Sequence, residues 1–181
     1  MGEPVRLRET LIAAALGMLE ADREEPSLRA VARAAGVSAM APYNHFSDKA
    51  GLLAAVANHG FEALRDALAA ADDLHDPHEA LIAQGIAFVD FARANPALFR
   101  LMYSHQYGSA DTAAVQATYK ILTDRVAGIL PAHASAAALA CRSLVQGMAT
   151  IVLNGRLAPS KTEDIATAVR LFVVGLVSGI K

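Results

Sequence analysis

The sequence predicts an all-α protein, and three observations lead to that prediction. Apolar residues recur at spacings of three and four, alternating β-branched patterns are nearly absent, and alanine is the commonest residue. Of the 181 residues, 54% are hydrophobic and 19% are charged, a balance that excludes a disordered chain. The single cysteine, Cys141, cannot form a disulfide within the chain, and a chain of this length buries a core without one.

The first four of nine expected helices follow from caps and stops. Ser27 is expected to cap the second helix, and Gly36 to end it by supplying a left-handed residue. Ser38 begins the third, and Ser47 or Asp48 caps the long fourth helix. The expected ranges are 4–21, 28–35, 38–46 and 48–71.

The five remaining helices are longer and more apolar on average. Asp76, Pro77 and Glu79 form a start signal, with an N-cap, a first-turn proline and a glutamate that closes a capping box. Asn95, again followed by proline, repeats the start signal, and Pro131 breaks the seventh helix. The expected ranges are 77–94, 96–103, 111–130, 134–154 and 162–179.

Composition also divides the chain. Three short, charged helices occupy the first 50 residues, so we predict one domain over 1–50 and a second over 51–181. The 16 basic and 18 acidic residues give a net charge of −2, so any nucleic-acid binding must come from a local patch. Residues 27–49 contain such a patch, because Arg29, Arg33 and Lys49 outnumber Asp48 and leave a net charge of +2.

A helix, a three-residue turn containing glycine, and a second helix follow one another within 27–53. This arrangement lets two helices cross steeply and project the second into a DNA major groove. Val31, Ala32 and Ala35 are expected to bury the first helix, and Val37 and Phe46 to anchor the second.

The residues of this segment resemble the DNA-binding signature of the TetR-like (tetracycline-repressor-like) transcriptional regulators. The matching pattern is L-x-x-V-A-x-x-A-G-V-S-x-x-x-x-Y-x-H-F-x-D-K-x-x-L-L. The resemblance implies three helices for DNA binding, a fourth as connector and five for ligand binding and dimerisation. It further implies a ligand-responsive regulator, a repressor rather than an activator, that binds a pseudo-palindromic operator as a homodimer.

Ten residues are implied to contact DNA. Serines at helix starts and basic side chains would bind phosphates, Tyr43 and His45 would contact the backbone or brace the helix, and Asn44 could pair with adenine. Ala39 and Met40 could contact thymine methyl groups. The full set is Ser27, Arg29, Arg33, Ser38, Ala39, Met40, Tyr43, Asn44, His45 and Lys49.

Pro42 departs from the family pattern, which usually has a leucine or similar apolar residue there. Proline removes an amide that would bond the Ser38 carbonyl, and it disfavours helical angles at Ala41. The recognition helix is therefore expected to start late or to open with a distorted turn. Such a start would disfavour base contacts by Ala39 and Met40.

Aromatic and polar side chains gather in the middle of the second domain. Apolar walls with a few polar groups are the general recipe for a small-molecule site, although aromatics at helical spacing are also ordinary core residues. Together with the resemblance, the cluster predicts an effector pocket of unknown ligand. Its members are Phe88, Phe91, Phe99, Met102, Tyr103, Gln106, Tyr107, Tyr119, Gln146 and Met148.

The last two long helices are apolar nearly all round. A monomer would leave one face of them in water, so we predict a homodimer through a four-helix bundle; the alternative is that the two helices cover each other. The expected interface residues are Leu139, Val145, Ile151, Val152, Ile165, Val169, Phe172, Val173 and Leu176.

Other classes find less support in the sequence. We expect no cofactor and no metal, although His75 and His78 lie near a helix start, and no membrane span, since the apolar runs are short or interrupted by charge. The first residues lack an apolar signal core, so a cytoplasmic protein is expected. The alternatives are a ligand-binding or scaffold protein whose helix–turn–helix no longer reads DNA, and an all-α enzyme using His105, for which the sequence shows no partner carboxylate.

Overall fold

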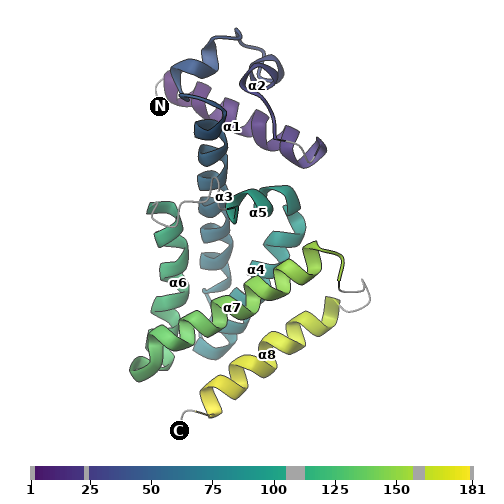
Figure 1. The fold of residues 1–181 in the computed structure, drawn as a ribbon. Coiled ribbons are helices and arrows are strands. Elements are labelled where there is room, and N and C mark those ends of the chain that lie inside the picture. The colour runs from purple at the N-terminus through teal and green to yellow at the C-terminus, as the bar shows by residue number, and fades with distance from the viewer. Residues whose placement is uncertain (1–2, 23–24, 105–112, 157–161, 180–181) are drawn as a thin grey trace. The chain divides into compact units, whose positions relative to one another are not determined.

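A computed structural model describes residues 3–22, 25–104, 113–156 and 162–179, and the regular elements of this part of the chain are all helices (Figure 1). The predicted all-α class is confirmed. The α-helices are α1 (Glu3–Asp22), α2 (Leu28–Ala34), α3 (Lys49–Ala71), α4 (Pro77–Ala94), α5 (Pro96–Met102), α6 (Ala113–Ile129), α7 (Ala134–Leu153) and α8 (Thr162–Ser178). Two short 3-10 helices, η1 (Ala41–Asn44) and η2 (Pro131–His133), complete the described elements.

The predicted count of nine α-helices is wrong by one over the described residues. The segment expected as a helix over 38–46 contains only η1, in which Pro42 lies at the start. The amides of Ala41, Tyr43 and His45 bond to carbonyls three residues back, as between Tyr43 N and Met40 O at 3.1 Å. Because Pro42 has no amide and crowds the preceding turn, the i to i−4 ladder of an α-helix does not form.

Backbone contacts divide the chain into two compact units. The described residues of Met1–Glu62 and Asn95–Val115 form unit 1, and those of Ala63–Ala94 and Gln116–Lys181 form unit 2. Helix α3 runs without a break from unit 1 into unit 2. The functional division at residues 50 and 51 stays a prediction.

Unit 1 packs α1 against α2 and α5, and α2 against η1. Leu11, Val31 and Leu52 are fully buried there. The N-terminal amides of α5 donate to a side chain of α1: the Glu20 carboxylate accepts from Leu98 N at 2.8 Å and from Ala97 N at 3.3 Å. A carboxylate at a helix N-terminus satisfies free amides and complements the helix dipole.

Unit 2 packs α4 against α7 and α8. Its core contains Leu81, Ile82, Val126, Ala137, Cys141, Val169 and Val173. Gly85 marks the close approach of α4 to α8, since a Cβ there would lie 2.8 Å from Val169 Cγ1.

Helix α4 begins as predicted but uses its glutamate differently. Asp76 Oδ1 accepts from His78 N at 2.8 Å and from Glu79 N at 3.1 Å, and these bonds lower the pKa of Asp76. The capping box expected of Glu79 does not form; instead its carboxylate binds the Arg170 guanidinium of α8 through both oxygens. This bidentate pair joins the two helices and lowers the pKa of Glu79.

One described stretch, Pro131–Leu153, is long and apolar enough by composition to cross a membrane. It contains α7, which carries Arg142 and packs in the core of unit 2 against α4 and α8. One such helix, identified by length and composition only, is weak evidence for a membrane span.

Candidate DNA-binding surface and ligand cavity

The turn between α2 and η1 is built as the sequence predicts. Ser27 Oγ accepts from Ala30 N at 3.2 Å and caps α2, whose inner face buries Leu28, Val31 and Ala32. Gly36 ends the helix with a φ of 69°, a conformation that a side chain disfavours. The chain then turns toward η1.

The recognition segment, residues 37–46, is anchored by buried apolar residues and exposes Ser38, Ala39, Met40, Tyr43 and Asn44. Pro42 is buried and Phe46 is 5% exposed. Met40 and Tyr43, in contrast, are 67% and 45% exposed, so neither side chain is part of the buried core. Because Pro42 and Phe46 are buried, Met40 and Tyr43 project into solvent, where they are accessible to another molecule.

Nine of the ten residues predicted to bind DNA are exposed, and all ten lie in unit 1. The tenth, His45, is half-buried, with its ring centroid 6.3 Å from that of Phe46. Arg29 and Arg33 lie exposed on α2. The surface thus combines basic, hydroxyl and apolar side chains, the mixture that contacts phosphates and base edges.

Lys49 has a partner that the sequence did not reveal. Its ammonium lies 2.7 Å from Glu25 Oε2, and Asp48 caps the same helix start by accepting from Gly51 N at 2.8 Å. A phosphate at this position would have to replace Glu25. Arg8 of α1 was also missed; its guanidinium lies 5.5 Å from the Phe46 ring centroid and adds a cation beside the recognition segment.

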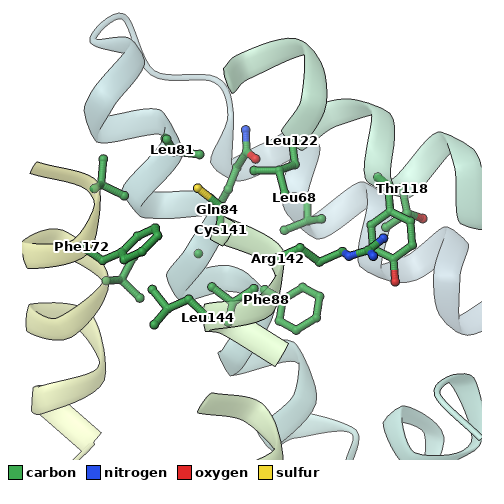
Figure 2. Close-up of a pocket in the computed structure, with 15 residues that line it drawn as sticks. Leu68, Leu81, Gln84, Phe88, Thr118, Leu122, Cys141, Arg142, Leu144 and Phe172 are labelled. Atoms are coloured by element: carbon green, nitrogen blue, oxygen red, sulfur yellow. The ribbon is translucent and has the colours of Figure 1, made fainter. Parts of the chain in front are cut away.

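Unit 2 contains a cavity of about 40 Å³ (Figure 2). Residues from the end of α3 and from α4, α6, α7 and α8 line it, and nearly all of its walls are apolar. The lining residues are Leu68, Leu81, Gln84, Gly85, Phe88, Thr118, Tyr119, Leu122, Cys141, Arg142, Leu144, Val145, Val169, Phe172 and Val173.

The structure separates the residues predicted to form one pocket. Phe88 and Tyr119 line the cavity. Phe99, Met102 and Tyr103 instead pack in unit 1, where Tyr103 lies 5.6 Å from the Phe61 ring and 4.6 Å from that of Phe99. The remaining members lie in unit 2 outside the cavity lining (Phe91, Gln146 and Met148) or outside the described residues (Gln106 and Tyr107, together with His105).

The residues predicted for the dimer interface differ in exposure and fall into three groups. Val145, Ile165, Val169 and Val173 are buried within unit 2, Val152, Phe172 and Leu176 are half-buried, and Leu139 and Ile151 are exposed. Four of the nine (Val145, Val169, Phe172 and Val173) line the cavity. Exposed apolar residues that the prediction did not include are Leu171 at 69% and Val174 at 54%.

A polar network reaches the cavity from outside. The Asp72 carboxylate, just beyond α3, accepts from Gln84 Nε2 and from Arg125 Nε at 2.6 Å, and its backbone carbonyl accepts from Arg125 Nη2 at 2.9 Å. Gln84 is 2% exposed, and its Oε1 is buried with no donor among the described residues. No sequence pattern singled Gln84 out, because its partners come from distant positions.

Arg142 and Cys141 also line the cavity. The Arg142 guanidinium lies 4.7 Å from the Tyr119 ring centroid. Burial raises the pKa of the Cys141 thiol to about 11, so the thiolate form is disfavoured. Over the described residues, no three His, Cys, Asp or Glu side chains gather in a way that could hold a metal ion.

An exposed recognition segment on one unit and an apolar cavity in the other are the features expected of an all-helical DNA-binding regulator. Residues 11–56 match the sequence model of bacterial regulatory proteins of the tetR family, and residues 81–176 match that of the tetracyclin repressor-like C-terminal domain. No curated protein matches the chain. The chain belongs to the TetR family of transcriptional regulators.

Solved structures share the fold along nearly the whole chain. A protein with unknown function from Rhodococcus sp. RHA1 is 32% identical, with a TM-score of 0.80 over 92% of this chain and 93% of that one. A regulatory protein in the tetR family from Rhodococcus RHA1 is 22% identical, with a TM-score of 0.66 over 95% and 97%. The TetR family transcriptional regulator PfmR from Thermus thermophilus is also 22% identical, with a TM-score of 0.61 over 96% of each chain. At 22% identity the latter two show the fold alone.

Proposed function

We propose that this protein is a cytoplasmic, ligand-responsive repressor that binds a pseudo-palindromic operator as a homodimer and leaves it when a small effector binds unit 2. One observation carries the proposal: buried Pro42 and Phe46 hold the recognition segment so that Met40 and Tyr43 face solvent. Two such segments about one DNA turn apart, ~34–36 Å, would contact two half-sites.

The size of the cavity supports a response to ligand. About 40 Å³ is far below the ~300–1,000 Å³ of typical small-molecule sites, so a ligand must displace the surrounding side chains. A ligand that fits only an expanded state binds that state preferentially and shifts the population toward it. Helix α3 offers a route to the DNA-binding residues, since it begins at Lys49 and carries Leu68 of the cavity wall.

Exposed apolar residues on the last two helices support a dimer. Leu139 and Ile151 on α7 and Leu171 and Val174 on α8 are 45–69% exposed. Apolar surface of this kind on two neighbouring helices favours burial against a symmetry mate. The buried members of the predicted interface would then support the bundle from within each subunit.

The test is fluorescence anisotropy with duplexes from the DNA flanking the gene, titrated at several salt concentrations. The wild type is expected to bind at low salt, with the logarithm of affinity falling linearly with the logarithm of salt concentration. Arg33→Ala is expected to weaken binding and to make the slope shallower by about 0.9, the value for one lost phosphate contact. Arg93→Ala, an exposed arginine of α4 in unit 2, is the matched control and should leave the slope unchanged.

A second candidate function is favoured by the local structure of the same surface. Only η1 stands where an α-helix was expected, and Lys49 is already paired with Glu25. A ligand-binding or scaffold protein that no longer reads DNA would show these features. Binding to no duplex at low salt, by a dimer that is folded, would favour this second function over the repressor.

A further inference from the structure

Gln84 gives the cavity a chemical preference. Its side chain lines the cavity, is 2% exposed and carries the only buried side-chain oxygen or nitrogen without a hydrogen-bond partner among the described residues. Figure 2 shows its carboxamide among apolar neighbours such as Leu122. A buried acceptor without a donor destabilises the structure around it, so a molecule that brings a donor gains affinity in addition to that from its apolar contacts.

The orientation of this carboxamide is fixed by its neighbour. Nε2 donates to Asp72 Oδ1, and an ionised carboxylate can only accept hydrogen bonds. A flipped amide would place Oε1 against that carboxylate, so Oε1 must face away from Asp72. Arg125 holds Asp72 in place through two further hydrogen bonds. The unpartnered atom of Gln84 is therefore the acceptor Oε1, and a ligand would have to supply a hydrogen-bond donor to it.

The charges near the cavity argue against an anion beside Gln84. Oε1 is itself electronegative, and the Asp72 carboxylate lies directly behind the amide. Arg142 is the one lining residue that could attract an anion; it is half-buried and its guanidinium stacks on Tyr119. Arg142 retains contact with water there, whereas Gln84 does not. The lack of a hydrogen-bond partner is therefore more costly at Gln84 than at Arg142.

We propose that the cavity binds a neutral, mainly apolar molecule with one hydroxyl or N–H group, which donates to Gln84 Oε1. The proposal rests on the proposed function only in taking this cavity as the effector site. Phenol, toluene and benzoate are suitable probes, because they share a ring and differ in the group that would meet Gln84.

The experiment is calorimetric titration of the full chain with each probe at neutral pH. An apolar cavity alone would rank toluene above phenol, since phenol loses hydration of its hydroxyl group on entering. The proposal predicts the reverse, with phenol bound ~10-fold more tightly than toluene and benzoate bound more weakly than phenol. Toluene at least as tight as phenol, no phenol binding at millimolar concentration, or benzoate tightest of the three would each overturn the proposal.

The variant Gln84→Met tests the residue itself. It keeps the length of the side chain and removes the acceptor, so toluene should now bind more tightly than phenol. Gln146→Met is the matched control, because Gln146 lies on α7 outside the cavity lining, and it should keep the wild-type ranking. An unchanged phenol preference in Gln84→Met contradicts the proposal. If Gln84→Met does not fold, the wild-type ranking still decides.

Binding and DNA release are separate measurements, so the two proposals can fail separately. Phenol that binds through Gln84 but leaves the DNA complex intact would overturn the regulatory role and leave the ligand class standing. Release of DNA by a ligand whose binding is indifferent to Gln84→Met would overturn the ligand class and leave the regulatory role standing.

Discussion

Unit 1 carries its candidate functional side chains on the outside, whereas unit 2 carries them in its core. Met40 and Tyr43 project from a segment anchored by Pro42 and Phe46. In unit 2, buried Gln84 and Val169 line the cavity and also hold its helices together. The difference teaches that function and stability are separable in unit 1 and coupled in unit 2, because an exposed contact adds little to folding and a buried one adds much.

The largest effect is expected where unit 1 has a buried anchor. Phe46→Ala should lower the free energy of unfolding by about 3–5 kcal/mol, because a 5% exposed phenylalanine leaves a cavity behind. Tyr43→Ala, three residues away, should change it by no more than about 0.5 kcal/mol. Chemical denaturation measures both, and anisotropy should show weak DNA binding by both. Equal stability losses in the two variants would break the comparison.

Two glycines of unit 2, one closely packed and one with open space around it, test how tightly its helices pack. Gly85→Ala should lower the free energy of unfolding by about 1–3 kcal/mol, since its Cβ would lie 2.8 Å from Val169 Cγ1 and 3.4 Å from Val145 Cγ1. Gly147→Ala meets nothing within 4 Å and should raise it by about 0.5–1 kcal/mol. Urea denaturation distinguishes the signs, and a stabilising Gly85→Ala would contradict the close packing of α4 on α8.

A smaller effect is expected at the contact between α1 and α5. Glu20→Ala removes the acceptor for Leu98 N and Ala97 N and should lower the free energy of unfolding by about 0.5–2 kcal/mol, as for other lost caps. Glu9→Ala, an exposed glutamate on the same helix, is the control and should have little effect. Thermal unfolding followed by circular dichroism measures the difference, which would vanish if the cap contributed nothing.

The smallest effect is expected from the exposed pair of Glu79 and Arg170. The guanidinium lowers the pKa of Glu79, so the pair stabilises the fold above the unfolded-state pKa of about 4.3 and loses this effect as pH falls through the lower folded-state pKa. Arg170→Met should therefore lower the melting temperature slightly at neutral pH, and the gap from wild type should close in acid.

The control for this pair is Arg29→Met, an exposed arginine without an ion pair among the described residues. It should show no gap that depends on pH between 7 and 3. An Arg170→Met gap that stays constant over the same range would mean that the pair acts through packing rather than charge.

The ranges of the helices could be predicted from the sequence because their signals are local. Asp76 and Pro77 begin α4, and Gly36 ends α2 with the expected positive φ. The exposure of the candidate DNA-binding residues could be predicted as well, since they all lie within one segment, 27–49. Pro42 was recognised as a departure, although its full consequence, a 3-10 helix in place of an α-helix, depends on how the whole segment packs.

The cavity could not be predicted in the same way because it is assembled from distant positions. Gln84 lies on α4, Arg125 on α6 and Asp72 in the turn after α3, and no spacing in the sequence relates them. The aromatic cluster was divided for the same reason, since Phe99 and Phe88 are close in sequence yet belong to different units. Likewise, helical periodicity marks Val169 as apolar without saying whether its own chain or a second one covers it.

The most direct test of the central claim is a hydroxyl-radical footprint on the DNA that flanks the gene. Two recognition segments per dimer predict two protected patches, centred about 10–10.5 base pairs apart or a multiple of that spacing. Tyr43→Ala should lose both patches while retaining the wild-type melting temperature. A single patch, or no protection at low salt by a folded dimer, would contradict the account.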